Sequence, residues 1–230
     1  LKNDSDVDQN DTLSVSALRL SSEDTNPITI EANGLGSISN DYGTLIVSSD
    51  GGYSFTADGP ASQALVEGVT ATTSFEITIS DGELSSTNTL TLTVTGRNDS
   101  PTPTADSAAL QEDSTISRNA ASGLLTNDSD PDTGSVLKVS GIRVGSQSAT
   151  VDPTGGATLS NAYGTLTVNA DGSYRFSGDG EASQKLGQGA TAQTSFAYTV
   201  SDGVSGSEDL TLFTSLEAWN RNKTYSTPDG

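Results

Sequence analysis

The sequence predicts an all-β protein made of two tandem antiparallel β-sandwich domains. Three observations predict it: apolar residues alternate with polar ones at the strand period of two, helix-forming runs are absent, and one pattern of strands and turns occurs twice. Half-buried strands about ten residues apart, with polar outer faces, are typical of such sandwiches. Apolar residues make up only 32% of the chain, so we expect each core to be small.

The internal repeat is clearest around a Tyr-Gly pair. Residues 42–59, YGTLIVSSDGGYSFTADG, and residues 163–180, YGTLTVNADGSYRFSGDG, share 11 of 18 positions at an offset of 121. An acidic phrase, NDSDVD at residues 3–8 and NDSDPD at residues 127–132, recurs at an offset of 124. This self-similarity indicates the duplication of a unit of roughly 110–120 residues.

Each unit is expected to carry its acidic loop near its start and to continue as strands and hairpins. Residues 43–55 predict a hairpin with Leu45 and Val47 facing inward, a turn at Asp50-Gly51, and Tyr53 and Phe55 on the returning strand. Further strands are marked by alternating apolar residues: Phe75, Ile77 and Ile79; Leu90, Leu92 and Val94; and, in the second unit, Phe196, Tyr198 and Val200.

Domain boundaries follow from the repeat. We expect a first sandwich at residues 1–98, a second at residues 99–212, and an unassigned tail at residues 213–230 that contains the only tryptophan, Trp219. Pro101 and Pro103 mark the boundary, because proline cannot donate a hydrogen bond to a sheet. Nothing in the first unit matches residues 105–124, where an edge strand is expected near Ala108–Gln111. The first domain therefore lacks its initial strand, which is either cut away or supplied by a neighbouring molecule.

Charge and composition exclude several classes of function. A formal charge of −20 offers no basic patch for nucleic acid and disfavours anionic membranes. The absence of His and Cys excludes a Ser-His-Asp triad and thiol chemistry. No run of 18 apolar residues is present, so we expect no membrane span. We expect no enzyme, because the paired carboxylates lie in Gly- and Ser-rich turns and not in an apolar cleft that would raise a catalytic pKa.

The acidic loops are the first candidate metal sites. Each places three aspartates at alternate positions: Asp4, Asp6 and Asp8, then Asp128, Asp130 and Asp132. Ca²⁺ prefers six to eight oxygen ligands, which a curled loop of this kind can supply. An EF-hand needs Gly at its sixth position and Glu at its twelfth, and the loops have neither. The alternative is an acidic turn whose side chains cap their own backbone.

Several separated motifs together resemble a known family. The phrases YGTLTVNADGSYRF, SFAYTVSDG, LTLTVTGRNDSP and LLTNDSDPD look like the VCBS-type repeats of large bacterial surface proteins, which are related to bacterial cadherin-like domains. The resemblance covers nearly all of residues 1–212. It implies Ig-like, cadherin-like β-sandwiches in tandem arrays of exported adhesins, often of the RTX type, with calcium at or near the domain junctions.

The resemblance adds a second set of candidate ligands at the junction. Carboxylates of successive domains share calcium in cadherin junctions, and this implies such a role for Asn98, Asp99, Glu112 and Asp113. The two SDG turns contribute weaker candidates, Asp81 and Asp202, whose alternative role is an ordinary hairpin turn.

These observations predict a non-enzymatic, calcium-stabilised extender or adhesion repeat at the bacterial cell surface or outside the cell. Its expected partners are neighbouring repeats and a host-surface or matrix glycan or protein. Two alternatives stay open: a filament subunit assembled by a donated β-strand, giving a homo-polymer, and a glycan- or protein-binding module. The aromatic residues that such a module would use are expected mainly in the core: Tyr42, Tyr53, Phe55, Tyr163, Tyr174 and Phe176.

Overall fold

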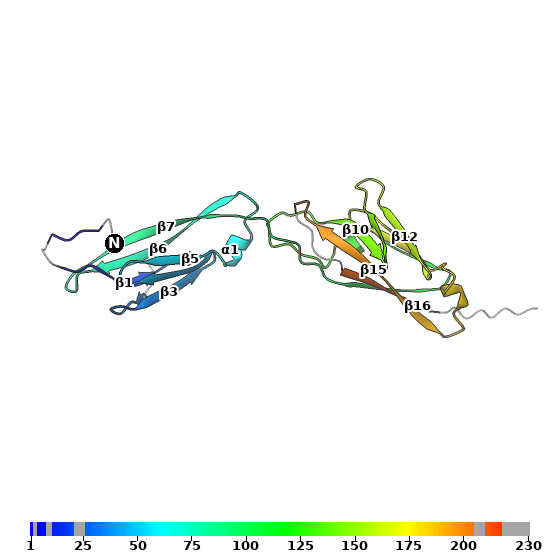
Figure 1. Ribbon diagram of the computed structural model, residues 1–230, viewed down its shortest axis with the longest axis horizontal. Coiled ribbons are helices and arrows are strands. Elements are labelled where there is room, and N and C mark those ends of the chain that lie inside the picture. Colours follow the sequence, from blue (N-terminus) through cyan, green and yellow to red (C-terminus); the bar gives the residue numbers. More distant parts are fainter. Residues whose placement is uncertain (2–3, 8–10, 21–25, 205–209, 218–230) are drawn as a thin grey trace, which may run out of the picture. The chain divides into compact units, whose positions relative to one another are not determined.

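The computed structural model describes residues 1, 4–7, 11–20, 26–204 and 210–217, and of residues 210–217 only Leu216 beyond the backbone. The chain divides into two compact units, Leu1–Asp99 and Ser100–Gly230, here called unit 1 and unit 2. Both units consist almost entirely of antiparallel strands, so the all-β prediction is confirmed (Figure 1).

Unit 1 contains two sheets and one short helix. The first sheet has the strand order β2-β1-β6-β7 and the second has the order β3-β4-β5. Their bounds are β1 Ser14–Arg19, β2 Ile28–Thr29, β3 Leu35–Asn40, β4 Gly43–Ser48, β5 Tyr53–Thr56, β6 Thr70–Ser80 and β7 Ser85–Thr95, with helix α1 at Pro60–Gln63.

Unit 2 repeats this plan and adds one strand to each sheet. The orders are β11-β10-β15-β16-β8 and β12-β13-β14-β9, so β8 extends the first sheet beyond β16 and β9 extends the second beyond β14. Their bounds are β8 Asp106–Gln111, β9 Thr115–Arg118, β10 Lys138–Val144, β11 Gln147–Thr150, β12 Ala157–Asn161, β13 Gly164–Val168, β14 Tyr174–Ser177, β15 Thr191–Ser201 and β16 Leu210–Glu217, with 3-10 turns at Ala120–Ser122 and Ser183–Lys185.

The hairpin of each repeat forms as its sequence predicts. Strand β4 turns into β5 with Leu45 opposite Phe55, and β13 turns into β14 with Leu166 opposite Phe176. The turn glycine, Gly51 or Gly172, has a positive φ of 87° or 79°. Only glycine adopts such a conformation without strain, which explains the repeated Asp-Gly pair.

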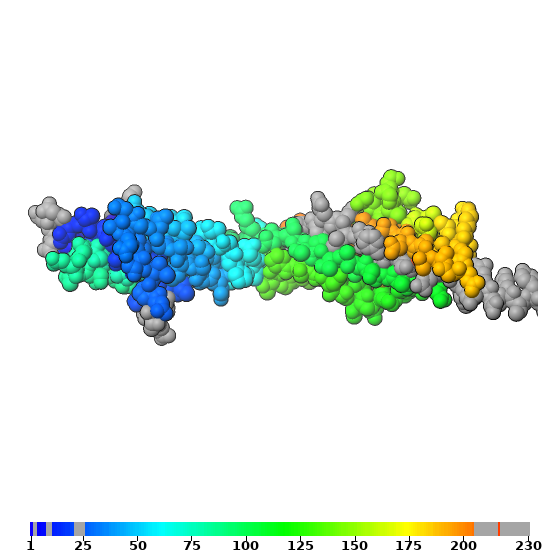
Figure 2. Space-filling view, turned by 90° about the horizontal axis from the view of Figure 1, so that it is seen from below, coloured from blue at the N-terminus to red at the C-terminus, as the bar shows by residue number. Residues whose placement is uncertain are grey.

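A separate core lies between the two sheets of each unit. In unit 1 it is formed by Val15, Leu18, Ile30, Leu45, Val47 and Phe75. In unit 2 it is larger, and Leu110 of β8 and Ile116 of β9 pack against it. An aromatic pair joins the sheets in both units: Phe55 with Phe75, tilted, and Phe176 with Phe196, T-shaped, at centroid distances of 5.9 and 5.8 Å. Figure 2 shows one face of each unit, with unit 1 coloured blue to green and unit 2 green to orange.

The structure bears on the expected core, on the expected tail and on the strand that unit 1 was expected to lack. Tyr53 is not a core residue, because 58% of its surface is exposed. The expected tail at residues 213–230 begins inside β16, which continues to Glu217, while Trp219 and the rest of the tail lie outside the described residues. Among the described residues of unit 1, no strand pairs with the outer edge of β7 or of β5.

Candidate metal centre

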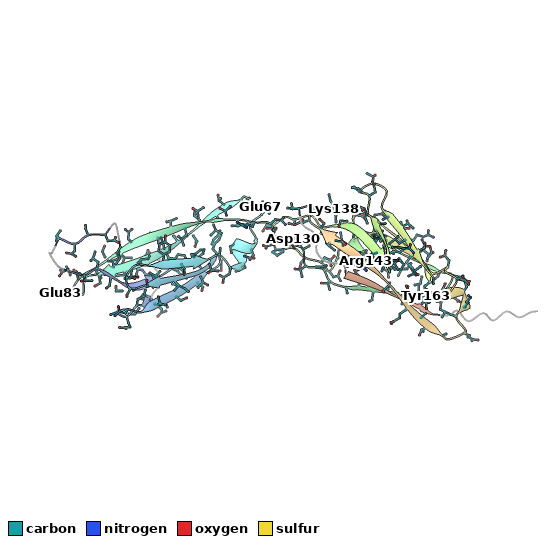
Figure 3. The ribbon with its side chains drawn as sticks, in the orientation of Figure 1. Glu67, Glu83, Asp130, Lys138, Arg143 and Tyr163 are labelled. Carbon is teal, nitrogen blue, oxygen red and sulfur yellow. The ribbon has the colours of Figure 1, made fainter. Side chains whose placement is uncertain are left out.

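The acidic loop of unit 2 is fixed by the segment that leads into the unit. Thr102 and Ser129 exchange two backbone hydrogen bonds, of 2.7 and 3.1 Å. The amide of Thr104 donates to Asp128 Oδ1 at 2.7 Å, and Asn127 Nδ2 donates to the Thr104 carbonyl at 3.0 Å. These hydrogen bonds hold the loop in place. It lies at the end of unit 2 that carries Asp130, and Tyr163 lies at the opposite end (Figure 3).

Two carboxylates of this loop have buried oxygens that accept no hydrogen bond. Asp128 Oδ2 and Asp130 Oδ2 are both buried in this way, although the other oxygen of each accepts a backbone amide: Thr104 N for Asp128, and Asp132 N at 2.8 Å for Asp130. The third aspartate, Asp132, is only 3% exposed. Buried carboxylate oxygens are costly unless a positive group meets them. The loop thus offers anionic oxygens that a cation can bind.

Asp106 belongs to the same neighbourhood, although the sequence pattern did not single it out. Its Oδ2 accepts a 2.6 Å hydrogen bond from the hydroxyl of Tyr198. Burial raises the pKa of Asp106, and this hydrogen bond opposes the rise. Burial also raises the pKa of Asp128, with a smaller contribution from the Asp106 charge, against the hydrogen bond from Thr104. Like charges crowd here, which is the electrostatic condition that a bound cation relieves.

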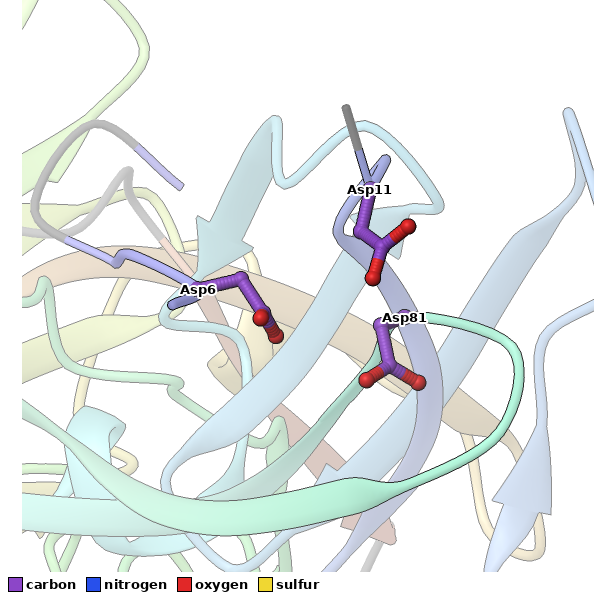
Figure 4. Close-up of side chains that lie close together, drawn as sticks. All are labelled: Asp6, Asp11 and Asp81. Carbon is purple, nitrogen blue, oxygen red and sulfur yellow. The ribbon is translucent and has the colours of Figure 1, made fainter. Parts of the chain in front are cut away.

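Unit 1 forms a second acidic cluster from different residues. One carboxylate oxygen from each of Asp6, Asp11 and Asp81 lies within 4.8 Å of the others (Figure 4). Asp4, Asp6 and Asp81 also line an open depression of about 490 Å³. Asp11 was not expected as a ligand, whereas Asp8 lies outside the described residues.

Both SDG turns use one carboxylate oxygen for the backbone. Asp81 Oδ1 accepts the amides of Glu83 and Leu84, each at 2.7 Å, and these hydrogen bonds hold the pKa of Asp81 below its usual range. Asp202 Oδ1 accepts the amide of Val204 at 2.7 Å. The turn interpretation is therefore correct for both residues, and Asp81 is also part of the cluster with Asp6 and Asp11.

Two of the expected junction residues belong to unit 1 and two to unit 2. Asn98 and Asp99 lie at the end of unit 1, where Glu67 Oε2 accepts the Asn98 amide at 2.8 Å and Asn98 Nδ2 donates to the Asp99 carbonyl at 2.7 Å. Glu67 was not predicted, and it lies at the opposite end of unit 1 from Glu83 (Figure 3). The contact between Glu67 and Asn98 could not be predicted from the sequence, because 31 residues separate the two.

Glu112 and Asp113 do not lie near the acidic loop of unit 2. They follow the far end of β8, whose six residues span about 17 Å, whereas Thr104 and Asp106 lie at its near end. There the amide of Asp113 donates to the Gly178 carbonyl at 3.2 Å, and Gln184 Nε2 donates to Asp113 Oδ1 at 2.6 Å. Within unit 2, the length of β8 thus separates Glu112 and Asp113 from Thr104 and Asp106. Their expected role as junction ligands together with Asn98 and Asp99 stays a prediction.

Comparison with known proteins gives the family. The profile of the bacterial cadherin-like domain matches residues 1–96 and 98–214, one match for each unit. The chain belongs to the bacterial cadherin-like domain family. This confirms the cadherin-like resemblance read from the repeated motifs.

Solved structures show weaker likeness to the bacterial cadherin-like chain. An endo-fucoidan hydrolase of glycoside hydrolase family 107 is 18% identical, with a TM-score of 0.29 over 86% of this chain and 25% of its own. Protocadherin gamma B2 extracellular cadherin domains 3–6 are 15% identical, with a TM-score of 0.41 over 88% and 48%. Human protocadherin-24 EC1-2 is 18% identical, with a TM-score of 0.42 over 81% and 82%. The chain thus spans half or less of the first two, and no curated protein sequence matches it.

Cadherin-like domains are typically non-enzymatic repeats of extracellular or surface proteins, and they generally bind Ca²⁺. In the part of the chain that the structure describes, no helix has both the length and the apolar character needed to cross a membrane.

Proposed function

We propose that the two bacterial cadherin-like units form a calcium-stabilised, non-enzymatic extender of a bacterial adhesin, outside the cell or on its surface. The observation that supports this most directly is the pair of buried oxygens, Asp128 Oδ2 and Asp130 Oδ2, that accept no hydrogen bond. A hard cation takes such oxygens as ligands, and the family to which the chain belongs supplies the precedent for Ca²⁺.

The proposed role of the ion is mechanical. Residues 102–104 are hydrogen-bonded to the acidic loop, so an ion held by Asp128 and Asp130 would also fix the segment that leads into unit 2. In unit 1 the ion would bring together the turn at Asp81 and the loop that carries Asp6 and Asp11. Neutralised loops repel one another less in a chain of charge −20, which favours a compact and stiff repeat.

A calcium titration tests the proposal. Melting in millimolar calcium is expected to raise the Tm of unit 2 relative to melting in chelator, because the ion binds the folded loop only. Asp130→Asn keeps an oxygen for the Asp132 amide but removes the charge, so the calcium-induced shift in Tm is expected to fall to less than half. Asp152→Asn is the matched control, since Asp152 caps its own turn through Thr154 and Gly155 and lies outside the acidic loop.

Calorimetry with separate variants distinguishes the sites. Asp128→Ala is expected to remove one calcium-binding event of unit 2, and Asp81→Ala one of unit 1. Identical melting curves and identical small-angle scattering in chelator and in calcium would refute the calcium-stabilised role.

The surface location and the VCBS-type, RTX-associated array are part of the same proposal, with neighbouring repeats as the expected partners. Protease treatment of intact bacteria that produce the protein tests the location. Complete degradation of the chain under conditions that leave cytoplasmic markers intact is expected, and full protection contradicts a surface role.

A further inference from the structure

One place on the outer face of the larger sheet differs between the units in charge and in volume. It lies where β10 passes between β11 and β15 in unit 2, and where β1 passes between β2 and β6 in unit 1. The strands keep one register, because Val139 pairs with Val200 as Val15 pairs with Ile79, and both pairings shift after this pair. Each position of this face can therefore be compared between the units.

An arginine occurs at this place in both units, but the residue opposite it on the neighbouring strand differs. Arg19 pairs with Glu76 of β6, and its Nε donates to Glu76 Oε2 at 2.6 Å. The corresponding pair in unit 2 is Arg143 with Ala197, so a methyl group takes the place of the carboxylate. A guanidinium has five N–H donors, so Arg143 can meet a carboxylate from outside beside any partner that it has in the fold.

A glycine near this arginine opens a depression in the sheet. Gly141 takes the place of Ala17 and lies between Thr150 of β11 and Thr199 of β15. Because neighbouring strands lie about 4.8 Å apart, the two threonines stand about 10 Å apart with only main chain between them. The depression has a volume of about 310 Å³. Its lining residues with polar side chains are Arg143, Ser148, Thr150 and Thr199.

The strands around the depression carry only positive charge. The chain has 30 acidic and 10 basic residues, but β10, β11 and β15 contain no acidic residue. The exposed Lys138, at the start of β10, takes the place of Ser14. Figure 3 shows Lys138 nearer than Arg143 to the end of unit 2 that carries Asp130. Relative to unit 1, this face gains one positive charge and loses the negative charge of Glu76, which suits an anionic ligand.

We propose that this depression of unit 2 is a binding site for one uronic acid residue, a sugar that carries a carboxylate, within an acidic polysaccharide. The carboxylate takes the place that Glu76 has in unit 1 and pairs with Arg143, because a planar guanidinium matches a carboxylate through two parallel hydrogen bonds. The sugar ring lies over Gly141, where a side chain would displace it. The ring hydroxyls exchange hydrogen bonds with Thr150 and Thr199.

The form of the depression favours a sugar over an acidic peptide. It lies over β10, which is paired on both sides, so a peptide main chain finds no strand edge there. A sugar ring needs only side-chain hydroxyls, and the three at this site both donate and accept hydrogen bonds. The volume is that of a small ligand pocket, at the lower end of a range of about 300–1,000 Å³.

Titration of the intact chain with two matched sugars tests the proposal. The probes are a tetrasaccharide of glucuronate and its methyl ester, which has the same rings without the charge. The acid is expected to bind at least about tenfold more tightly than the ester, a difference of about 1.4 kcal/mol. Nuclear magnetic resonance is expected to show shifts at residues 141–143, 148–150 and 197–199. The titrations are run in calcium and repeated in chelator, with circular dichroism to verify the fold.

Two variants return the site to the form that it has in unit 1. Gly141→Ala fills the floor of the depression, and its expected effect is a loss of affinity for glucuronate of at least about fivefold. The added Cβ atom would lie 3.6 Å from Thr199 Oγ1, an ordinary contact, so this variant keeps the fold. Ala197→Glu restores the carboxylate opposite Arg143 and is expected to abolish saturable binding.

A matched pair of arginine variants separates the site from the general charge of the unit. Arg143→Ala is expected to weaken glucuronate binding at least about tenfold. Arg118→Ala removes the same charge from β9, which belongs to the other sheet of unit 2, and it is expected to leave the affinity unchanged.

Five results would overturn the proposal: no saturable binding of glucuronate at millimolar concentration, equal affinities for the acid and its ester, equal losses in Arg143→Ala and Arg118→Ala, tighter binding of tetraglutamate, or a preference for the acid that disappears in chelator while the fold is kept. Tighter binding of tetraglutamate would assign the site to an acidic peptide, and dependence on calcium would assign the carboxylate to a bound ion. A Tm that does not respond to calcium leaves all of these expectations unchanged, so the two proposals fail separately.

Discussion

At the scale of single residues, the buried carboxylate of Asp106, beside the acidic loop of unit 2, has one tyrosine as its hydrogen-bond donor. Tyr198 lies in the core with 1% of its surface exposed, and its hydroxyl donates to Asp106 Oδ2 at 2.6 Å. This hydrogen bond stabilises the charged form of Asp106, whereas burial raises the pKa of that carboxyl group. The sequence placed Tyr198 in a strand by its alternation, but the aspartate that it meets is 92 residues away and could not be predicted.

Removal of this hydroxyl tests its contribution. Tyr198→Phe leaves the ring in place but deprives Asp106 of its donor, so the free energy of unfolding of unit 2 is expected to fall by about 1–2 kcal/mol. Urea denaturation followed by circular dichroism measures the change. Tyr53→Phe, on an exposed tyrosine of unit 1, is the control, and an equal loss in both variants would contradict the assigned role.

The crowded carboxylates give a pH dependence of known sign. The pKa values of Asp106 and Asp128 lie above the ordinary 3.8. Below pH 3.8 both carboxyl groups are mostly protonated in the folded and in the unfolded chain, so they do not change the free energy of unfolding through their charge. As the pH rises, the unfolded chain releases these protons first, so calcium-free unit 2 loses stability.

Asp128→Asn is therefore expected to raise the Tm of calcium-free unit 2 by a few degrees at neutral pH, with no difference from wild type at about pH 3. Differential scanning calorimetry in chelator measures it. Asp171→Asn is the matched control of opposite sign, because hydrogen bonds from Ser173 hold the pKa of Asp171 below its usual range. A gain that persists unchanged at low pH would show that charge is not its cause.

At the scale of elements, the Tyr-Gly pair that revealed the repeat has a steric cause. A Cβ atom at Gly164, the first residue of β13, would lie 2.0 Å from the Ser177 carbonyl oxygen of β14, and Gly43 has the same relation to Thr56. The hairpins were predictable because turn residues and alternation are local signals. The edge strand expected near Ala108–Gln111 is present as β8. Its pairing was not predictable, because its partner β16 lies about a hundred residues later and nothing local specifies a parallel pair.

Gly164→Ala is accordingly expected to destabilise unit 2 by about 3 kcal/mol, since the strand pair must separate to admit a methyl group. Thermal melting measures the loss. Gly187→Ala is the matched control, because no atom lies within 4 Å of the added carbon there, and it is expected to leave the Tm unchanged. Equal Tm values for the two variants would contradict the steric explanation.

At the scale of the whole molecule, each unit has its own core and its own pair of sheets. The duplication made this organisation predictable. The acidic ligand sets were only partly predictable: the aspartates at alternate positions marked the loops, but the participation of Asp11 and Asp106 depends on how the chain folds back. The exposure of Tyr53 was not predicted for a similar reason. Its place in the alternating pattern is that of a core residue, but a side chain at that place is buried only where a further strand covers it.

Separate cores predict separate unfolding. Phe75→Ala and Phe196→Ala each remove a fully buried ring, at a cost of about 3–5 kcal/mol. Calorimetry is expected to resolve two transitions, with Phe75→Ala lowering only the transition of unit 1 and Phe196→Ala only that of unit 2. Unit 1, with fewer buried residues, is expected to melt first. A single transition that both variants shift equally would refute independent units.

The placement of β16 has a consequence for how unit 2 is made. This strand lies between β15, which precedes it, and β8, which opens the unit, so among the described strands of unit 2 the first pairs with the last. During synthesis or export from one end, β8 has no neighbour in its sheet until residues 212–217 have emerged. Unit 2 thus completes its sheet only when the whole repeat is available, in a single late closure over about a hundred residues of chain. The strand order of unit 2 therefore requires that the repeat be synthesised or exported as a whole before this sheet can form.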